Sequence, residues 1–289
     1  MKMRKFLLIP AAVVAMLATA CSSEDNIVVE QSAGTAEFAI GVSANVTDVV
    51  TRANEGTLDA SLLPDETAFK LEITGTYTEK DENDQEIQKT YNNGKWNSLS
   101  DYYKEKVKLN KGTYTATITA GNPAEEGIGK PYFVGVNENF TVKANTVQTY
   151  EIEAKLANSC FTFAVTDWML NYYKDIVLNI HTATNTFTFN PTSIIPSDLY
   201  FVAADQVLSI SGTAVKAQTG TPVEFPKTNI GVLDSENNVV DKTLAAQHRY
   251  AIVVDNSAVG SGNLTVKFDD TFTEVPAVEV ELNPDVEEE

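Results

Sequence analysis

The sequence predicts an all-β protein with two antiparallel β-sandwich domains in tandem and at most one short helix. Apolar residues alternate with polar ones along almost the whole chain after residue 35, which is the period of a half-buried strand. The alternating runs are rich in Thr, Val, Tyr and Phe, which fit a pleated surface with one buried face. Turns with Gly, Asn and Pro separate many short runs, and this spacing favours sandwiches over a parallel α/β sheet.

The first 20 residues predict an export signal in three parts. Lys2, Arg4 and Lys5 are basic, residues 6–17 form an apolar stretch, and small residues 18–20 precede Cys21. The apolar part is too short to cross a hydrocarbon layer of roughly 30 Å as a helix. An ordinary signal cut after residue 20 is the alternative. A short apolar stretch that ends at a cysteine favours a lipoprotein, with Cys21 as the lipidated first residue of the mature chain.

Residues 22–26, with the sequence Ser-Ser-Glu-Asp-Asn, form an acidic patch directly after that cysteine. The patch resembles the surface-export signal of Bacteroidota lipoproteins, which implies an outer-membrane anchor that faces the cell exterior. A solvated tether over residues 21–35 is a compatible interpretation. Two acyl chains on Cys21 are sufficient for stable attachment to the membrane.

The net charge disfavours two kinds of partner, and the cysteine content leaves one thiol in the mature chain. Residues 1–20 hold three of the 21 basic residues and none of the 40 acidic ones, so their removal takes the formal charge from −19 to −22. Nucleic-acid binding depends on basic residues, so no nucleic-acid partner is expected, and adhesion to a bare anionic lipid surface is disfavoured. Once Cys21 is acylated, Cys160 is the one remaining thiol. It lies in an apolar run and is predicted to be a small core residue.

The first predicted domain spans residues 36–157. Its alternating runs are Phe38–Val42, Phe69–Ile73, Val107–Leu109, Thr113–Thr119, Phe140–Val142 and Tyr150–Leu156. The last two runs flank a polar turn and predict a hairpin.

The second predicted domain spans residues 158–283, and residues 284–289 form an acidic tail. Its alternating runs are Ile176–Ile180, Phe187–Phe189, Val207–Ile210, Tyr250–Val254, Leu264–Phe268 and Val278–Leu282. Residues 167–173 predict the short helix, with Asp167 as its candidate N-cap. The boundary is placed near Ala157–Ser159, and one elongated domain is the alternative.

Several motifs follow one another in a fixed order within the first domain. They are Gly94–Trp96, Leu109–Ile118, Gly121–Gly127, Lys130–Phe133, Gly135, Phe140–Val142 and Leu156–Asn158. This succession resembles an uncharacterised family of Bacteroidota surface lipoproteins, a domain of unknown function, which is fimbrillin-like in organisation. Ala120 departs from the aromatic residue expected before Gly121. The resemblance implies an outer-membrane-anchored β-sandwich protein for which no catalytic residues are established.

The physical interpretation of these motifs is a scaffold. Tyr114 and Ile118 are expected to face a core. Gly121 and Gly127 permit turns with positive φ, and Pro131 fixes φ ahead of two rings that are expected to be buried.

No pattern in the sequence predicts catalysis, a cofactor or a metal. His181 and His248 are the only histidines, and neither has the neighbouring ligands that a zinc site needs. A nucleophile-elbow motif is also absent. The protein is therefore not expected to be an enzyme.

Four aromatic residues are candidates for stacking on sugars. Trp96, Tyr102 and Tyr103 lie in a polar segment, and Trp168 lies in the predicted helix. An exposed ring beside polar groups offers both an apolar face and orientation to a sugar. Trp96 is equally suited to close one end of a sandwich, and Trp168 to cover the seam between domains. Burial is favoured, because large rings usually bury their area.

Arg52 is the one basic residue between Lys5 and Lys70. In fimbrillin-type proteins, proteolysis at a basic residue near this place releases the first strand and opens a groove for a partner's strand. The resemblance therefore implies Arg52 as a maturation site. An ordinary loop arginine is the alternative, and it is favoured because basic residues are common in loops.

Two functions are consistent with these observations. The first is a surface lipoprotein with a structural or adhesive, fimbrillin-like role. The alternative is a glycan-binding accessory lipoprotein of a nutrient-uptake system. The expected partners are the membrane, through Cys21, and other surface proteins or glycans.

Overall fold

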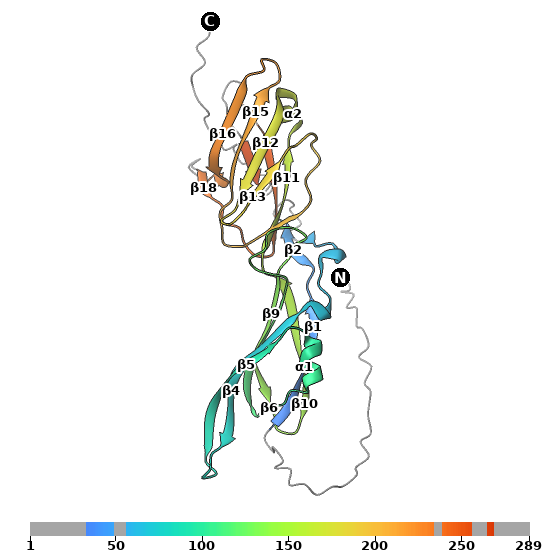
Figure 1. Cartoon of the computed structure of the whole chain (residues 1–289), viewed down its shortest axis with the longest axis vertical. Coiled ribbons are helices and arrows are strands. Elements are labelled where there is room, and N and C mark those ends of the chain that lie inside the picture. The colour runs from blue at the N-terminus through green and yellow to red at the C-terminus, as the bar shows by residue number, and fades with distance from the viewer. Residues whose placement is uncertain (1–32, 49–55, 234–238, 256–264, 269–289) are drawn as a thin grey trace, which may run out of the picture. The chain divides into compact units, whose positions relative to one another are not determined.

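The computed structural model describes residues 33–48, 56–233, 239–255 and 265–268 (Figure 1). Within these ranges the chain consists mainly of β-strands, which confirms the all-β class. The run Val278–Leu282, the acidic tail, Cys21 and Arg52 lie outside the described residues.

The first half of the chain forms a seven-stranded sheet. Its strands, in spatial order, are β5 (Glu86–Trp96), β4 (Lys70–Lys80), β7 (Gly112–Ala120), β9 (Phe133–Val142), β10 (Val147–Leu156), β1 (Ala33–Val42) and β6 (Leu109–Asn110). Strand β1 begins at Ala33, so the last residues of the predicted tether belong to this sheet.

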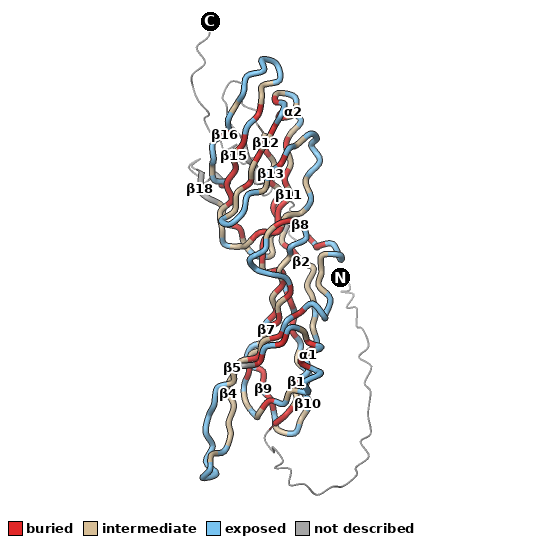
Figure 2. Tube along the Cα trace, viewed as in Figure 1, coloured by how far each residue is buried: buried red, intermediate tan, exposed pale blue. Residues whose placement is uncertain are grey.

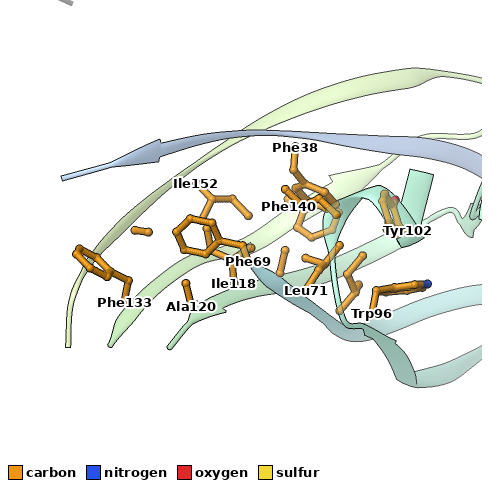
Figure 3. Close-up of a cluster of buried hydrophobic side chains, with 14 of the residues drawn as sticks. Phe38, Phe69, Leu71, Trp96, Tyr102, Ile118, Ala120, Phe133, Phe140 and Ile152 are labelled. Carbon is orange, nitrogen blue, oxygen red and sulfur yellow. The ribbon is translucent and has the colours of Figure 1, made fainter. Parts of the chain in front are cut away.

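Side chains from both ends of this sheet meet in one hydrophobic core (Figure 3). Leu71 of β4 pairs with Ile118 of β7, and both are buried together with Phe133 and Ile152. Leu109 of β6, at the other end of the strand order, belongs to the same cluster. The sheet therefore curves around its apolar face. Tyr114 and Ile118 face this core as expected.

The first strand runs parallel to its neighbour. β1 pairs with β10 from Thr35↔Val147 to Val42↔Ala154. This parallel pairing differs from the purely antiparallel sheets that the sequence predicts. The predicted hairpin of β9 and β10 is present and antiparallel, paired at Lys155↔Val134 and Leu156↔Phe133.

The second half of the chain forms two larger sheets and one small one. One sheet contains β3 (Gly56–Thr57), β2 (Asn45–Asp48), β19 (His248–Asp255), β11 (Ser159–Val165), β14 (Tyr200–Val202) and β8 (Gly127–Ile128), with β20 (Thr265–Phe268) beside β19. The other contains β13 (Thr186–Phe189), β12 (Tyr173–His181), β15 (Ser209–Lys216) and β16 (Pro222–Asn229). β17 (Gly231–Leu233) pairs with β18 (Val239–Asp241).

The two larger sheets of this half enclose a second hydrophobic core. Phe163 and Ile252 from the first of them pack in the same cluster as Leu178, Ile210 and Phe225 from the other. Buried and exposed residues alternate along these strands (Figure 2), as a sandwich requires.

Cys160 is fully buried, as predicted, and its Sγ atom lies 3.7 Å from the His248 carbonyl oxygen. It belongs to the first core, whereas its neighbour Phe161 belongs to the second. Strand β11 therefore contributes to both cores, one with each face.

The helices are short but more numerous than expected. α1 (Leu99–Glu105) forms where the sequence analysis places a polar segment without helix, and α2 (Asp167–Tyr172) forms where a helix is predicted. Two single turns, η1 (Ala60–Leu62) and η2 (Glu66–Ala68), are 3₁₀-helical. The N-cap of α2 is Thr166 and not Asp167, because the Thr166 hydroxyl accepts from the Met169 N–H. No helix among the described residues is long and apolar enough to span a bilayer.

Three strands from the first half of the sequence, β2, β3 and β8, lie in the sheet that contains β19, β11 and β14. β2 pairs in parallel with β19 at His248↔Thr47, and β8 pairs with β14 at Tyr200↔Ile128. The described residues, from Ala33 to Phe268, group as one compact unit. The division into two domains at Ala157–Ser159 stays a prediction.

Candidate functional site

Helix α1 brings three of the four candidate aromatic residues together. The helix starts at Ser98, whose hydroxyl accepts a hydrogen bond from the Asp101 N–H. It ends where Lys106 adopts a left-handed conformation with φ 50°. Trp96 ends β5 just before the cap, and Tyr102 and Tyr103 follow within the helix.

Trp96 and Tyr102 are core residues. Their relative exposures are 9% and 1%, and their ring centroids lie 4.9 Å apart in an edge-to-face contact. Trp96 Nε1 donates to Glu105 Oε2 at 2.6 Å, and the Tyr102 hydroxyl donates to the Ala36 carbonyl at 2.8 Å. Burial was the favoured alternative for Trp96, and the structure confirms it. Both side chains are buried, so neither offers an exposed ring to a sugar as Tyr103 does.

Tyr103 remains 43% exposed, and its hydroxyl binds the edge of β1. The hydroxyl donates to the Phe38 carbonyl and accepts from the Phe38 N–H, both at 3.0 Å. One phenol thereby replaces the two backbone groups that a neighbouring strand would supply. Burial raises the pKa of Tyr103, so the phenol keeps its proton for this contact at physiological pH.

A groove of about 410 Å³ lies beside this helix. It is lined by Phe38, Glu66, Thr67, Leu99, Ser100, Tyr103 and Lys104. We call it the α1 groove. Its volume falls within the ~300–1,000 Å³ range of small-ligand sites.

Trp168 lies apart from this group, on α2. It is half-buried, and its ring stacks on Tyr172 with centroids 4.7 Å apart and an interplanar angle of 14°. It also packs against the second core. The structure therefore does not bring Trp168 into one site with the other three rings.

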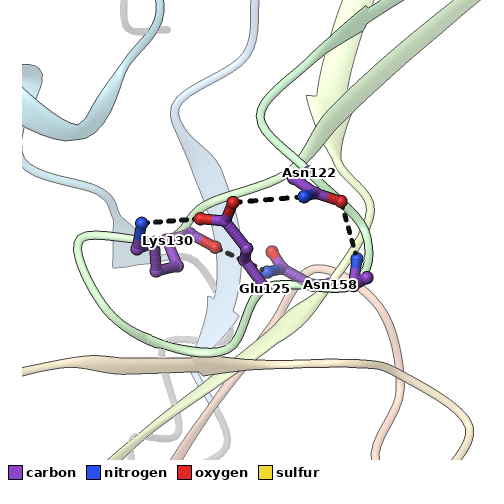
Figure 4. Close-up of polar contacts among 5 residues, drawn as sticks. Asn122, Glu125, Lys130 and Asn158 are labelled. Carbon is purple, nitrogen blue, oxygen red and sulfur yellow. Dashed lines mark hydrogen bonds and ion pairs between the residues drawn. The ribbon is translucent and has the colours of Figure 1, made fainter.

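Three of the motifs, Gly121–Gly127, Lys130–Phe133 and Leu156–Asn158, meet at a polar junction (Figure 4). Asn158 is buried; its amide nitrogen donates to the Lys130 carbonyl at 3.0 Å and its amide oxygen accepts from the Tyr132 N–H at 3.3 Å. Glu125 forms an ion pair with the Lys130 side chain at 2.6 Å and accepts from Asn122 at 3.1 Å. These three motifs are thus one structural unit, in which Asn158 fixes the path of the chain before β9.

Glu126 connects this loop to the second half of the chain. Its Oε2 atom accepts hydrogen bonds from three side chains: Thr182 at 2.6 Å, Asn185 at 3.0 Å and Thr184 at 3.1 Å. Its Oε1 atom accepts from Gln206 Nε2 at 2.9 Å and from the Ala203 N–H at 3.0 Å. Burial alone would raise the pKa of Glu126, but these donors outweigh it and lower the pKa.

Replacing Glu126 with glutamine is expected to lower the free energy of unfolding by about 1–3 kcal/mol. In the variant, the amide nitrogen of glutamine would face hydrogen-bond donors at a position where the carboxylate oxygen of Glu126 accepts hydrogen bonds. Hydrogen bonds to a charged group are worth about 1.5–3 kcal/mol. Urea denaturation measures the loss. Glu125→Gln is the matched control, because Glu125 is exposed and its ion pair with Lys130 is worth at most about 1 kcal/mol. Equal effects of the two changes would contradict the role given to Glu126.

The same carboxylate gives stability a pH dependence. The pKa of Glu126 is lower in the folded state, so its contribution is present above the unfolded pKa and is lost as pH falls through the folded pKa. The wild type is therefore expected to lose more stability than Glu126→Gln below about pH 4.5.

The two histidines do not form a catalytic group. His181 Nε2 lies 2.7 Å from Ser211 Oγ, but its Nδ1 lies 3.0 Å from the Thr186 hydroxyl, where a triad has a carboxylate. Desolvation, and then the charge of Lys227, lower the pKa of His181. His248 Nδ1 contacts a backbone carbonyl at 2.7 Å. Within the described ranges, no group of three His, Cys, Asp or Glu side chains is placed to hold a metal ion.

A comparison with known protein families assigns the chain to one of them. A family described as a domain of unknown function, DUF4493, matches residues 32–284. The chain belongs to the DUF4493 family. The match agrees with the resemblance seen in the motifs and extends it across both halves of the described structure. A comparison with functionally curated proteins gave no match.

Solved structures share a remote likeness with this DUF4493 chain. One, from Bacteroides thetaiotaomicron VPI-5482, is described as "putative polysaccharide binding proteins (DUF1812)"; it has 12% identity and a TM-score of 0.35, over 82% of this chain and 96% of that one. The tip fimbrial protein Mfa3 of Porphyromonas gingivalis has 8% identity and a TM-score of 0.34, over 78% and 97%. A "putative cell adhesion protein" of Bacteroides fragilis NCTC 9343 has 13% identity and a TM-score of 0.33, over 83% and 97%.

Several residues of this DUF4493 chain were not anticipated from the sequence. Glu126 gave no local signal, because its partners lie 56 to 80 positions away. Ser98 and Asp101, in contrast, form a Ser-x-x-acid pattern that predicts a helix start. That pattern would have placed Tyr102 and Tyr103 on one helical turn.

Proposed function

We propose that the protein is a lipid-anchored component of the outer cell surface, with a structural or adhesive role that works through its strand edges. Cys21 carries the anchor, the anchored protein lies on the exterior of the outer membrane, and the chain has no catalytic centre. The acidic patch after Cys21 and the resemblance to fimbrillin-like lipoproteins support this location.

The way in which β1 is bound is the observation that carries the proposal. β1 is joined to the sheet by parallel pairing with β10 and not through a hairpin, so no tight turn connects it to its neighbours. Ala36 and Phe38 are buried on its inner face. Removal of β1 would expose both the edge of β10 and the apolar sites that these side chains fill. A sheet with such a groove accepts a strand from a partner.

Cleavage after Arg52 is the proposed route to that groove, since it would separate β1 and β2 from the rest of the chain. The test compares the wild type, Arg52→Ala and Cys21→Ala in a Bacteroidota host, and measures the surface-exposed fraction, the mass of residue Cys21 and the assembly state. Wild type is expected to be acylated and to form higher-order species. Arg52→Ala should stay anchored but fail to assemble, and Cys21→Ala should leave the membrane.

Two outcomes would contradict this function separately. An unmodified Cys21 in freely diffusing wild-type protein would remove the anchor. Assembly of Arg52→Ala to the wild-type extent would remove cleavage at Arg52 as the route to strand exchange.

The alternative function, a glycan-binding accessory lipoprotein of a nutrient-uptake system, depends on an accessible ring. Of the four candidate rings, Tyr103 is the one that is exposed and also lines a groove. This observation favours glycan contact at α1, whether the protein serves adhesion or uptake.

A further inference from the structure

We propose that the α1 groove binds a neutral pyranose sugar, with Tyr103 as the stacking platform. The inference rests on the adhesive surface role proposed above and gives it a ligand class. It applies to the chain before β1 is released, because β1 supplies Phe38 to the groove, and it does not require cleavage at Arg52 or strand exchange.

The ring of Tyr103 is held rigid before any ligand arrives. Its hydroxyl makes two hydrogen bonds with the backbone of Phe38, one as donor and one as acceptor. Its ring packs edge-on against Tyr102 with centroids 5.4 Å apart. Tyr102 is itself buried and bonded to Ala36. A ligand that stacks on Tyr103 therefore has little side-chain entropy to overcome.

The walls of the groove combine apolar surface with both kinds of hydrogen-bonding group. Phe38 and Leu99 contribute the apolar part of the lining. Glu66 can accept hydrogen bonds, Lys104 can donate them, and the hydroxyls of Thr67 and Ser100 can do either. A pyranose presents an apolar C–H face and a rim of hydroxyls that both donate and accept, so it matches this set.

An extended peptide fits the same groove less well. Strand addition requires free backbone groups at a sheet edge. At this edge of β1, the N–H and carbonyl of Phe38 are taken by Tyr103, and the Ala36 carbonyl is taken by Tyr102. An acidic sugar is also disfavoured, because Glu66 lines the groove and the mature chain is strongly acidic.

The test uses the full mature chain and defined probes: the tetrasaccharides of β-1,4-linked glucose, mannose and galactose, sialyllactose, and a short acetylated Thr-Val repeat peptide. Saturation-transfer NMR and calorimetry measure binding. At least one neutral tetrasaccharide is expected to bind with a dissociation constant of about 1 mM or lower. Sialyllactose and the peptide are expected to bind more weakly.

Three variants separate stacking from folding. Tyr103→Ala removes the platform and is expected to weaken binding roughly tenfold or more. Tyr103→Phe keeps the stacking ring and loses both bonds to Phe38, so it is expected to bind more weakly than wild type by at most about threefold and more tightly than Tyr103→Ala. Ser100→Trp fills the groove from an exposed position, and it is expected to abolish binding while leaving the melting temperature unchanged. Gln88→Trp, on the exposed part of β5, is its matched control.

The proposal is overturned if no neutral tetrasaccharide binds the wild type, if the peptide binds more tightly than every sugar, or if Ser100→Trp binds sugar as well as Gln88→Trp does. Failure of Arg52→Ala to alter assembly would contradict the strand-exchange route and leave these sugar measurements unaffected.

Discussion

Replacing Trp96 with alanine is expected to lower the free energy of unfolding by about 3–5 kcal/mol. The indole is 91% shielded from solvent within the first core and contacts the ring of Tyr102. Truncation removes that contact, leaves a cavity in a curved sheet whose backbone cannot easily collapse, and leaves Glu105 without its indole donor at 2.6 Å. Urea denaturation followed by circular dichroism measures the change.

Trp168→Ala is the matched control for this prediction. Trp168 is half-buried and stacks on Tyr172 at one end of α2, so the surrounding side chains can adjust after its loss. It is expected to cost about 1–2 kcal/mol, which is a typical value for a point mutation. If Trp96→Ala retained wild-type stability but lost affinity for a sugar, Trp96 would be a binding residue, and the position given to it in the core would be wrong.

The strands could be predicted from the sequence because each has one buried face. In β7 the buried residues Tyr114, Ala116 and Ile118 alternate with threonines, and this local pattern survives in the folded sheet. The same reasoning placed Cys160 in the core, since it lies in an apolar run with β propensity. Local periodicity therefore gave the fold class and most strand positions.

The pairing of these strands could not be predicted in the same way. The register of β1 against β10 joins residues more than one hundred positions apart, and no local feature encodes a parallel neighbour. Helix α1 was missed for a different reason. Its seven residues are too few to show a helical period, and its two tyrosines resemble the aromatic content of a strand.

The candidate site was only partly predictable, because its residues come from segments that lie far apart in the sequence. Tyr103 was selected because aromatic residues beside polar ones can bind sugars, but its exposure depends on which side of α1 meets the core. Glu66 and Thr67 reach the α1 groove from η2, which lies more than thirty positions earlier in the chain. Sequence spacing gives no indication of that approach.

Gly121, in the motif that follows β7, is the site where a substitution has the second large expected effect on the free energy of unfolding. Gly121 has a φ of 88°, which is costly for any residue with a side chain. A Cβ atom there would also overlap the Pro131 carbonyl, which belongs to the segment that Asn158 holds in place. The backbone on both sides is fixed, because Tyr132 is bonded to Asn158 and Ala120 is paired with Phe133. Neither side can move away at low cost.

Gly121→Ala is therefore expected to lower the free energy of unfolding by about 2–6 kcal/mol, through backbone strain and overlap together. Gly129→Ala is the control for strain alone, because Gly129 has a φ of 66° but open space around its Cβ position. It is expected to cost about 1–2 kcal/mol. Thermal and urea unfolding of both variants measures the difference. Equal losses would mean that the Pro131 carbonyl can move away from the new side chain, and that the junction around Asn158 is not the rigid unit that its hydrogen bonds indicate.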